Sequence, residues 1–322
     1  MPLLATGDPS PPDGSPLPLV SIVTPSLDQG RFIEATIRSV LEQDYPRIEY
    51  VVVDGGSIDG TVDLLERYAE RVRWISEPDA GQAAAINKGF RSTSGTILGW
   101  LNSDDLYEPG AVAAAVARLR ARPEVPLVYG DAVHVDEAGR VLGPCPEVRP
   151  FDRRRLVHEI DFVVQPAAFF RRDAFEAAGG LDESLHWTMD YDLWLRLTEG
   201  HDAAYLPRPL AAYRLTGDNK TLRGGFARLA EIERVGRRHG AGGLPAAFRV
   251  EKLGLCRREA RAVARRGHLL QALGLLGRGA AAVLASPHAL GYALATLVSR
   301  RRRPGPGAGS TGGAGRGPRG PT

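Results

Sequence analysis

The N-terminal part of the chain alternates short apolar runs with amphipathic stretches. The run 20–24 is rich in β-branched residues, and 32–41 follows it with apolar residues at helical spacing. Residues 50–53 form a continuous apolar run, which is typical of a parallel strand buried on both faces. Strands that alternate with helices predict βαβ units, and hence an α/β fold with a mostly parallel sheet flanked by helices.

The same alternation extends along the chain and then changes. We expect strands over residues 72–75, 96–101, 125–129 and 164–170, and helices over 61–68, 80–90, 109–120, 172–178 and 190–197. Pro109 would lie in the first turn of its helix, where proline is tolerated. After residue 223 the chain is rich in Ala, Leu and Arg without a β-rich run, which predicts several helices over 224–298.

The net charge of +3 hides an uneven distribution. Residues 1–220 carry 22 Lys and Arg against 34 Asp and Glu, a balance of −12, whereas residues 221–322 carry 19 against 4, a balance of +15. The hydrophobic fraction of 43% and the charged fraction of 25% are ordinary for a globular protein and exclude global disorder. The charge asymmetry favours an acidic N-terminal part and a basic C-terminal part with different partners.

The cysteines and the chain ends bear on the cellular context. Cys145 and Cys256 lie far apart in the sequence and form neither a disulfide framework nor a metal-like spacing, which fits a reducing compartment. Residues 1–18 have no basic residue and no apolar run, so we expect a disordered lead-in and no secretory signal. The uncharged run 279–299 is long enough to span a bilayer, but its Ala, Gly and Pro287 favour a surface-lying or packed helix pair.

Polar clusters follow three of the predicted strands, at residues 24–28, 54–60 and 102–105. In an open parallel sheet, ligands bind outside the carboxyl ends of the strands, so these loops bring acids and glycines to one edge. Each cluster taken alone is better explained as a turn, a helix cap or an exposed loop. All three in this order favour a binding site.

Adjacent carboxylates at a strand end suit a hard divalent cation. Asp104 and Asp105 occupy such a position, and Mg²⁺ takes one or two carboxylates while water and substrate phosphates complete its coordination. The chain has no P-loop motif, which argues against a nucleoside triphosphatase. It has no Gly-x-Gly-x-x-Gly after the first strand, which argues against a dinucleotide oxidoreductase. A nucleotide diphosphate held by a metal is the remaining interpretation.

The three clusters belong to longer segments that resemble the family 2 glycosyltransferases. These segments are 20–26, 52–61, 77–82, 86–89, 100–107, 179–183 and 189–196. The resemblance covers about residues 19–215. It implies the GT-A fold, a nucleoside-diphosphate sugar as donor, and an inverting displacement.

The resemblance also implies which residues contact the donor. The donor-binding candidates are Pro25, Ser26, Asp54, Gly56, Ser57, Gln82, Asn87, Lys88, Asn102, Ser103, Arg214 and Lys220. Asp54 would lie near the base and ribose, and Arg214 and Lys220 would contact the diphosphate. Solvated surface charge is the alternative for the last two.

Metal and catalytic roles are carried over in the same way. The triplet 102–104 is similar to the family's Asp-x-Asp motif with Asn in place of the first acid, so Asp104 is expected to bind Mn²⁺ or Mg²⁺ with Asp105 beside it. Asp190 matches the catalytic base, which would take the proton from an acceptor hydroxyl. Its alternative role is the N-cap of the helix that follows. Asp192 is a second, weaker candidate for the base.

Two other functions remain open for the acidic part. A sugar-phosphate nucleotidyltransferase has a similar sheet but should carry a glycine-rich basic motif near its first strand, which this chain lacks. A catalytically degenerate nucleotide-binding scaffold would fit Gly55, Asn102 and Thr216, which depart from the family pattern. The presence of Asp104 and Asp190 argues against that scaffold.

The basic part predicts a different surface. It carries no nucleic-acid-binding motif, and arginines beside apolar helix faces suit an anionic membrane. We therefore expect four regions: a disordered lead-in over 1–18, a GT-A domain over 19–223, a basic helical extension over 224–298, and a disordered basic tail over 299–322. The protein would use a glycan or lipid-linked acceptor in polysaccharide biosynthesis, in the cytoplasm and peripheral at the inner face of the cell membrane, without nucleic acid as a partner.

Overall fold

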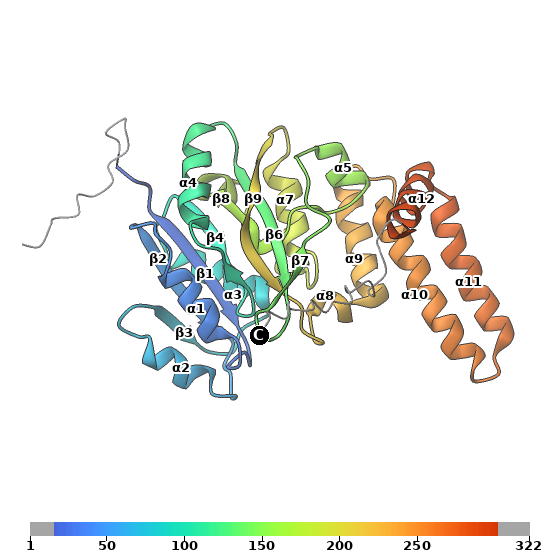
Figure 1. Cartoon of the computed structure of the whole chain (residues 1–322), viewed down its shortest axis with the longest axis horizontal. Coiled ribbons are helices and arrows are strands. Elements are labelled where there is room, and N and C mark those ends of the chain that lie inside the picture. The colour runs from blue at the N-terminus through green and yellow to red at the C-terminus, as the bar shows by residue number, and fades with distance from the viewer. Residues whose placement is uncertain (1–15, 302–322) are drawn as a thin grey trace, which may run out of the picture.

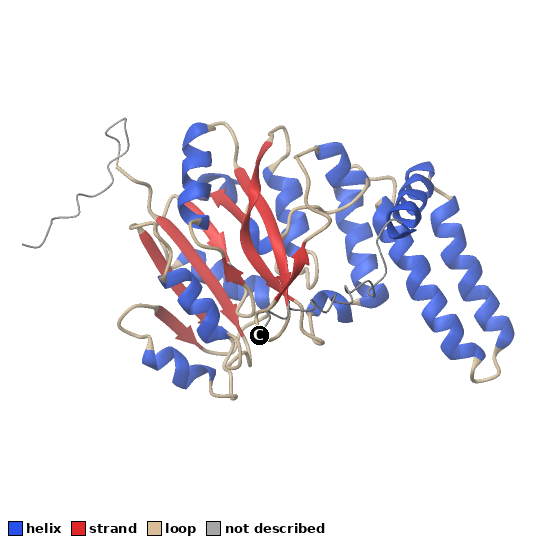
Figure 2. Cartoon of the chain, in the orientation of Figure 1, coloured by secondary structure: helices blue, strands red, loops and turns tan. Residues whose placement is uncertain are grey.

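A nine-stranded sheet with helices on both faces forms the centre of the molecule (Figure 1, Figure 2). The computed structural model describes residues 16–301, and only the backbone of residues 222 and 295–301. The strand order is β3-β2-β1-β4-β8-β6-β9-β5, with β7 beside β6. The strands are β1 (Val20–Ser26), β2 (Ile48–Asp54), β3 (Arg73–Ser76), β4 (Ile97–Trp100), β5 (Leu106–Tyr107), β6 (Leu127–Val135), β7 (Val141–Pro144), β8 (Ala168–Arg171) and β9 (Ala203–Arg214).

The helices divide into those that follow the strands and a C-terminal group. The first set is α1 (Ile33–Leu41), α2 (Thr61–Arg67), α3 (Gln82–Arg91), α4 (Ala111–Ala121), α5 (Arg153–His158), the 3₁₀ helix η1 (Gln165–Ala167), α6 (Arg172–Ala177), α7 (Met189–Leu197) and α8 (Lys220–Arg223). The C-terminal group is α9 (Gly225–Arg238), α10 (Ala246–Ala264), α11 (Leu269–Leu284) and α12 (Pro287–Arg301).

The parallel half of the sheet is buried on both faces, as the continuous apolar runs predict. Strand β1 pairs in parallel with β2 and β4, and β2 with β3. Val23 and Val51 face one core cluster with α3, whereas Ile22 and Val52 face the other with α1 and α4. Gly89 lets α3 approach β1 closely, because a Cβ there would lie 2.5 Å from the side chain of Val23.

The predicted α/β fold is confirmed, with differences in its second half. Strand β8 lies between β4 and β6 and runs antiparallel to both, so the sheet is mixed there. The strand expected over 125–129 is the start of the longer β6, and that expected over 164–170 begins with η1. Pro109 precedes the helix: Gly110, with φ of 73°, is the N-cap of α4.

Helix α9 packs into the core of the GT-A domain, which was expected to end at residue 223. Its residues Leu229, Ile232 and Val235 are buried in the same core cluster as α3 and α7, and Phe248 of α10 joins them. The apolar face of α9 is therefore part of the main core. The disordered segments expected over 1–18 and 299–322 fall mostly outside the described residues, and α12 continues to Arg301.

Helices α10, α11 and α12 pack together at the end of the molecule remote from α1 and α2 (Figure 1). Ala246, Val283 and Ala289 form a small core among them. Within residues 16–301, no single helix has the length and apolar content needed to cross a membrane; α11 with Pro287–Leu294 meets that test only as a pair bent by 100°.

Candidate active site

The carboxyl ends of β1 and β4 open into a cavity of about 430 Å³, here called the sheet-edge cavity. Because β1 and β4 are parallel neighbours, the loops after them meet at this edge. Pro25 and Ser26 line the cavity from the end of β1, and Asn102, Ser103 and Asp104 line it from the loop after β4. The Ser26 hydroxyl is buried and has no hydrogen-bond partner among the described residues, so it is available to a ligand.

A chain of hydrogen bonds connects three predicted donor residues in this cavity. Lys220 donates from Nζ to Oε1 of Gln82 over 3.1 Å, and Gln82 donates from Nε2 to Oδ1 of Asn102 over 2.8 Å. Burial lowers the pKa of Lys220, although Asp190 and Glu231 act in the opposite direction. A partly desolvated ammonium group of this kind interacts strongly with an anionic ligand.

The loop after β2 is held together by Asp54, which does not line the sheet-edge cavity. Its carboxylate is fully buried and accepts hydrogen bonds from the backbone N–H groups of Gly56 (3.1 Å) and Ser57 (2.9 Å) and from the Ser76 hydroxyl (2.7 Å). Ser57 donates its own hydroxyl back to Asp54. Gly56 has φ of 86°, which favours glycine. Asp54, Gly56 and Ser57, which were predicted to contact the donor, thus bond to one another and fix the shape of the loop.

The side chain of Asn102 is also fully hydrogen-bonded within the protein. Its Oδ1 accepts from Gln82 and from Trp100 Nε1 (2.8 Å), and its Nδ2 donates to Gln165 (2.9 Å) and Asp105 (3.3 Å). Since all its side-chain groups have partners, Asn102 positions the loop that carries Asp104.

The two acidic residues after β4 differ in where their carboxylates lie. Asp104 lines the sheet-edge cavity, whereas Asp105 is 1% exposed and accepts from the backbone N–H of Arg214 over 2.9 Å. Burial raises the pKa of Asp104, and burial together with the charge of Asp104 raises that of Asp105 well above its usual range. A divalent cation would offset this charge. Asp104 offers a carboxylate oxygen, which fits a hard divalent cation that takes one carboxylate from the protein. Substrate oxygens and water would complete the coordination of that cation.

Arg214 lies beneath the cavity and does not line it. Its guanidinium donates to the backbone carbonyls of Asp104 (2.8 Å), Asp136 (3.0 Å) and Glu137 (3.0 Å), and it stacks on the ring of Phe32. The side chain is 3% exposed in total. Arg214 therefore braces the loop after β4, and its predicted contact with the diphosphate stays a prediction.

Two residues of α3 that were predicted to bind the nucleotide-sugar donor contact other parts of the protein. Asn87 is buried, donates to the backbone carbonyl of Leu181 (3.0 Å) and accepts from its N–H (2.9 Å), which ties α3 to the loop before α7. Lys88 forms an ion pair with Glu77 over 2.8 Å. Neither residue lines the sheet-edge cavity.

A second cavity of about 660 Å³, here called the helix-side cavity, meets the first one at Asp190. Asp161, Arg228, Phe248 and Tyr292 contribute to its walls, three of them from the C-terminal helices α9, α10 and α12. The residues that line both cavities are Gln165, Trp187, Asp190, Tyr213 and Thr221. The carboxylate of Asp190 thus has access to ligands in both.

Burial and nearby cations set the pKa of Asp190, and the Asp190 carboxylate in turn acts on Asp161, a residue in no sequence motif. Burial raises the pKa of Asp190, while Arg228 and Lys220 act to lower it. Burial and the charge of Asp190 raise the pKa of Asp161 well above its usual range. Asp190 is not the N-cap: Thr188 holds that position, and Asp190 lies in the first turn of α7. Asp161 and Asp190 lie far apart in the sequence and share no motif, so the sequence alone does not show that they interact.

Asp192, the second candidate for the base, faces away from both cavities. It is 2% exposed and forms an ion pair with Arg196 over 2.7 Å, with His239 at 3.7 Å. These partners are on α7 and just after α9, so Asp192 joins the two helices.

Glu231 of α9 holds the segment that leads into α7. Its carboxylate accepts hydrogen bonds from the backbone N–H groups of His186 (3.0 Å), Trp187 (2.7 Å) and Thr188 (2.9 Å) and from the Thr188 hydroxyl (2.8 Å). Burial acts to raise the pKa of Glu231, but these bonds lower it. Trp187 lines both cavities and His186 lines the sheet-edge cavity, so α9 positions part of the site.

The mixed sheet with its flanking helices, together with the likeness to solved glycosyltransferase structures, shows the predicted GT-A fold. Residues 21–179 match the family model described as "Glycosyl transferase family 2", and over this part the chain belongs to the family 2 glycosyltransferases. The predicted family is thereby confirmed.

Among curated proteins, the chain is similar to chondroitin synthase of Escherichia coli, with 29% identity over 210 residues. The match covers 64% of this chain and 30% of that protein. The chain thus spans about a third of the length of this relative.

Among solved structures, the chain is similar to a mannosyltransferase from Pyrobaculum calidifontis in complex with GDP-Man and Mn²⁺, with a TM-score of 0.56 and 23% identity over 88% of this chain and 81% of that one. It is also similar to residues 1–349 of TarS from S. aureus in complex with UDP-GlcNAc, with a TM-score of 0.55 and 14% identity over 88% of this chain and 77% of that one. At these identities the two structures show the shared fold.

Proposed function

We propose that the protein is an inverting glycosyltransferase that moves a sugar from a nucleoside-diphosphate donor to an acceptor hydroxyl. The single observation that carries the proposal is that Asp190 lines both cavities. A donor in the sheet-edge cavity and an acceptor in the helix-side cavity would meet at this carboxylate. The similarity to a mannosyltransferase and to TarS, solved with GDP-Man and UDP-GlcNAc, supports a nucleotide sugar in the first cavity.

Asp190 is the proposed general base. The acceptor oxygen attacks the anomeric carbon from the side opposite the diphosphate, and its proton passes to the Asp190 carboxylate. The bond between the anomeric carbon and the phosphate oxygen breaks, and the nucleoside diphosphate leaves with that electron pair. A pKa raised by burial makes Asp190 a better proton acceptor than an exposed Asp.

Charge on the leaving diphosphate requires compensation. We assign this to Lys220 and to a Mn²⁺ or Mg²⁺ ion held by Asp104, since both side chains line the sheet-edge cavity. The cation supplies Lewis-acid stabilisation of the phosphate oxygens when it is bound. The mannosyltransferase similar to this chain was solved with Mn²⁺, which supports this choice of ion.

The acceptor proposed for the helix-side cavity is a glycan or a lipid-linked sugar. Trp187, Phe248 and Tyr292 give the cavity aromatic walls, and aromatic rings pack well against the apolar faces of sugars. Arg228 adds a positive charge, although Glu251 already pairs with it over 2.9 Å. The similarity to a chondroitin synthase supports a role in polysaccharide synthesis.

We also propose that α11 rests on an anionic membrane at the cytoplasmic face. Its residues Leu269, Leu270, Leu273 and Leu284 are 63–85% exposed, and at helical spacing they lie on one side of the helix. Residues 221–322 carry 19 basic and 4 acidic side chains, which favours anionic lipids. Leucine and arginine together are typical of helices that lie in a membrane interface.

The decisive test is a screen of nucleotide sugars with the full chain, measuring release of nucleoside diphosphate with and without Mn²⁺. We expect turnover of at least one donor that Asp190→Asn and Asp104→Asn reduce about a hundredfold or more and that Asp202→Asn, an exposed control, leaves unchanged. Binding of nucleoside diphosphate without turnover of any donor would support the degenerate scaffold. Formation of a nucleotide sugar from a sugar phosphate and a nucleoside triphosphate would support a nucleotidyltransferase.

A further inference from the structure

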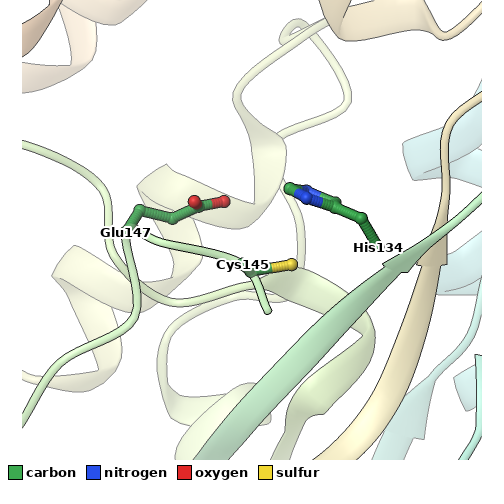
Figure 3. A group of neighbouring side chains, drawn as sticks. All are labelled: His134, Cys145 and Glu147. Atoms are coloured by element: carbon green, nitrogen blue, oxygen red, sulfur yellow. The ribbon is translucent and has the colours of Figure 1, made fainter. Parts of the chain in front are cut away.

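Three metal-ligating side chains that the proposed reaction does not use lie together beside the sheet. The imidazole of His134, the thiol of Cys145 and the carboxylate of Glu147 offer ligand atoms that all lie within 4.8 Å of one another. Figure 3 shows the three side chains pointing toward a common space. We propose that His134, Cys145 and Glu147 form a binding site for a transition-metal ion of the Zn²⁺ class, separate from the hard cation at Asp104.

The backbone places the three ligands on connected segments. His134 lies in β6 opposite Gly143 of β7, next to an irregularity in the strand pairing at Val135. Cys145 follows β7 directly, and its N–H donates to the backbone carbonyl of Ala132 in β6 over 2.8 Å. Glu147 comes two residues later. The ladder between β6 and β7, extended by the bond between Cys145 and Ala132, therefore holds the backbones of His134 and Cys145 in register.

The separations of the ligand atoms are compatible with a tetrahedral ion. Ligands about 2.0–2.3 Å from Zn²⁺ lie roughly 3.4–3.8 Å from one another, so separations within 4.8 Å require only small side-chain rotations. Three protein ligands leave a fourth position for water or another donor, and Glu147 lines the helix-side cavity, from which that donor would come.

The charges around the thiol also favour a cation. Cys145 is 5% exposed, and the carboxylate of Glu147 lies within 4.8 Å of its thiol. In the described part of the chain, neither the ring nitrogens of His134 nor the carboxylate of Glu147 has a hydrogen bond to the protein, although the His134 ring packs against Tyr213 at 5.9 Å. These ligand atoms are available to an ion.

The type of donor selects the type of ion. A thiolate and an imidazole prefer Zn²⁺ or Co²⁺ to Mg²⁺, whereas Asp104 offers only oxygen. Binding would displace the thiol proton of Cys145, so that the ion neutralises a thiolate and a carboxylate in place. The bound ion would cross-link β6 to the segment after β7 and fix the part of the helix-side cavity wall that Glu147 forms.

Cobalt titration of the full chain tests the site directly. After dialysis against a chelator, Co²⁺ should produce the near-ultraviolet charge-transfer absorption of a cobalt–thiolate bond at one equivalent per chain, and Zn²⁺ should remove it. Cys145→Ser should abolish the absorption. Cys256→Ser is the matched control, because Cys256 is the other buried cysteine and lies outside the group, and this variant should keep it. Asp104→Asn should keep it as well.

A second variant guards against misfolding of the first. His134 is only partly buried, so His134→Gln should keep the circular dichroism spectrum of the parent and weaken Co²⁺ binding at least tenfold. Absence of thiolate absorption in the parent chain would overturn the proposal. Absorption that survives Cys145→Ser, or that disappears with Cys256→Ser or Asp104→Asn in a folded variant, would overturn it too.

Discussion

The carboxylate of Glu231 accepts both the backbone N–H and the hydroxyl of Thr188, over 2.9 Å and 2.8 Å. Thr188 is the N-cap of α7, and Asp190 lies two residues further along that helix. A residue of the C-terminal helix α9 therefore fixes the segment that carries the proposed base. The amino-terminal part of the chain does not complete the site by itself.

Glu231→Ala should lower both stability and activity. The variant leaves three backbone N–H groups of a partly buried segment without their acceptor, which costs on the order of 1–3 kcal/mol of unfolding free energy. Chemical denaturation and the steady-state rate measure the two effects. Glu233→Ala is the control on the same helix: Glu233 forms an ion pair with Arg237 at the surface, and such pairs contribute little. Equal losses in the two variants would contradict the role of Glu231.

Asp104→Asn should remove the dependence of turnover on Mn²⁺. The carboxamide is neutral and a weaker ligand, so we expect a fall in kcat of about a hundredfold or more, with a much smaller change in the absence of metal. A metal titration of the rate measures this. Asp105→Asn, in contrast, should act mainly on stability, because Asp105 is buried and bonded to the backbone of Arg214. Unchanged metal dependence in Asp104→Asn would exclude Asp104 as the ligand.

The rate should rise with pH through the raised pKa of Asp190. A general base must be ionised, and burial raises its pKa above the usual range, so the acid limb of kcat/KM should lie above about 3.9, the ordinary pKa of Asp. Lys220→Gln removes a positive charge that lowers this pKa, so the limb should move to still higher pH. A pH–rate profile is the measurement. A limb that does not move would show that Lys220 does not interact with the base.

The same pKa shift predicts that Asp190→Asn is more stable than the parent at neutral pH. A carboxyl with a raised pKa in the folded state destabilises that state increasingly as pH rises from the unfolded-state pKa through the folded-state pKa. Asn removes this cost, and it also removes the charge that raises the pKa of Asp161. Thermal denaturation should show the difference at pH 7 and its disappearance near pH 4. Lower stability of Asp190→Asn at pH 7 would contradict the assignment of a raised pKa.

Replacing Leu270 and Leu273 by Ser should reduce membrane binding of the full chain at least fivefold. Both side chains are exposed, at 85% and 63%, so their loss should leave the fold intact. Flotation with vesicles of neutral lipid alone or mixed with phosphatidylserine measures binding, which should require the anionic lipid and fall with added salt. Leu142→Ser, at an exposed leucine in β7, is the control. Unchanged flotation of the double variant would contradict membrane docking by α11.

The fold could be predicted from sequence because its parallel half is buried on both faces. A continuous apolar run such as that of β2, with amphipathic helices before and after it, fits a buried parallel strand and little else. The second half of the sheet was harder to predict from the sequence. The short β5 has too few residues to show a period, and nothing local distinguishes the antiparallel β8 from a parallel strand, because direction depends on partners far away in the chain.

The site could be predicted at the level of loops better than at the level of side chains. Asp54 is the last residue of β2 and Asp104 follows β4, yet only Asp104 lines the sheet-edge cavity, since the carboxylate of Asp54 is used by its own loop. Asn102 and Arg214 likewise satisfy neighbouring groups. Glu231 and Asp161 lie in no motif, and their roles depend on contacts between segments distant in the sequence.

Apart from the five residues that they share, the two cavities are lined mainly by different segments of the chain. The loops after β1 and β4 line the sheet-edge cavity, whereas Arg228, Phe248 and Tyr292 reach the helix-side cavity from the last third of the chain. Substitutions at these three positions would therefore change the helix-side cavity without altering the loops after β1 and β4. Under the proposed function, a lineage could exchange one acceptor for another at these positions while its activated sugar is inherited unchanged.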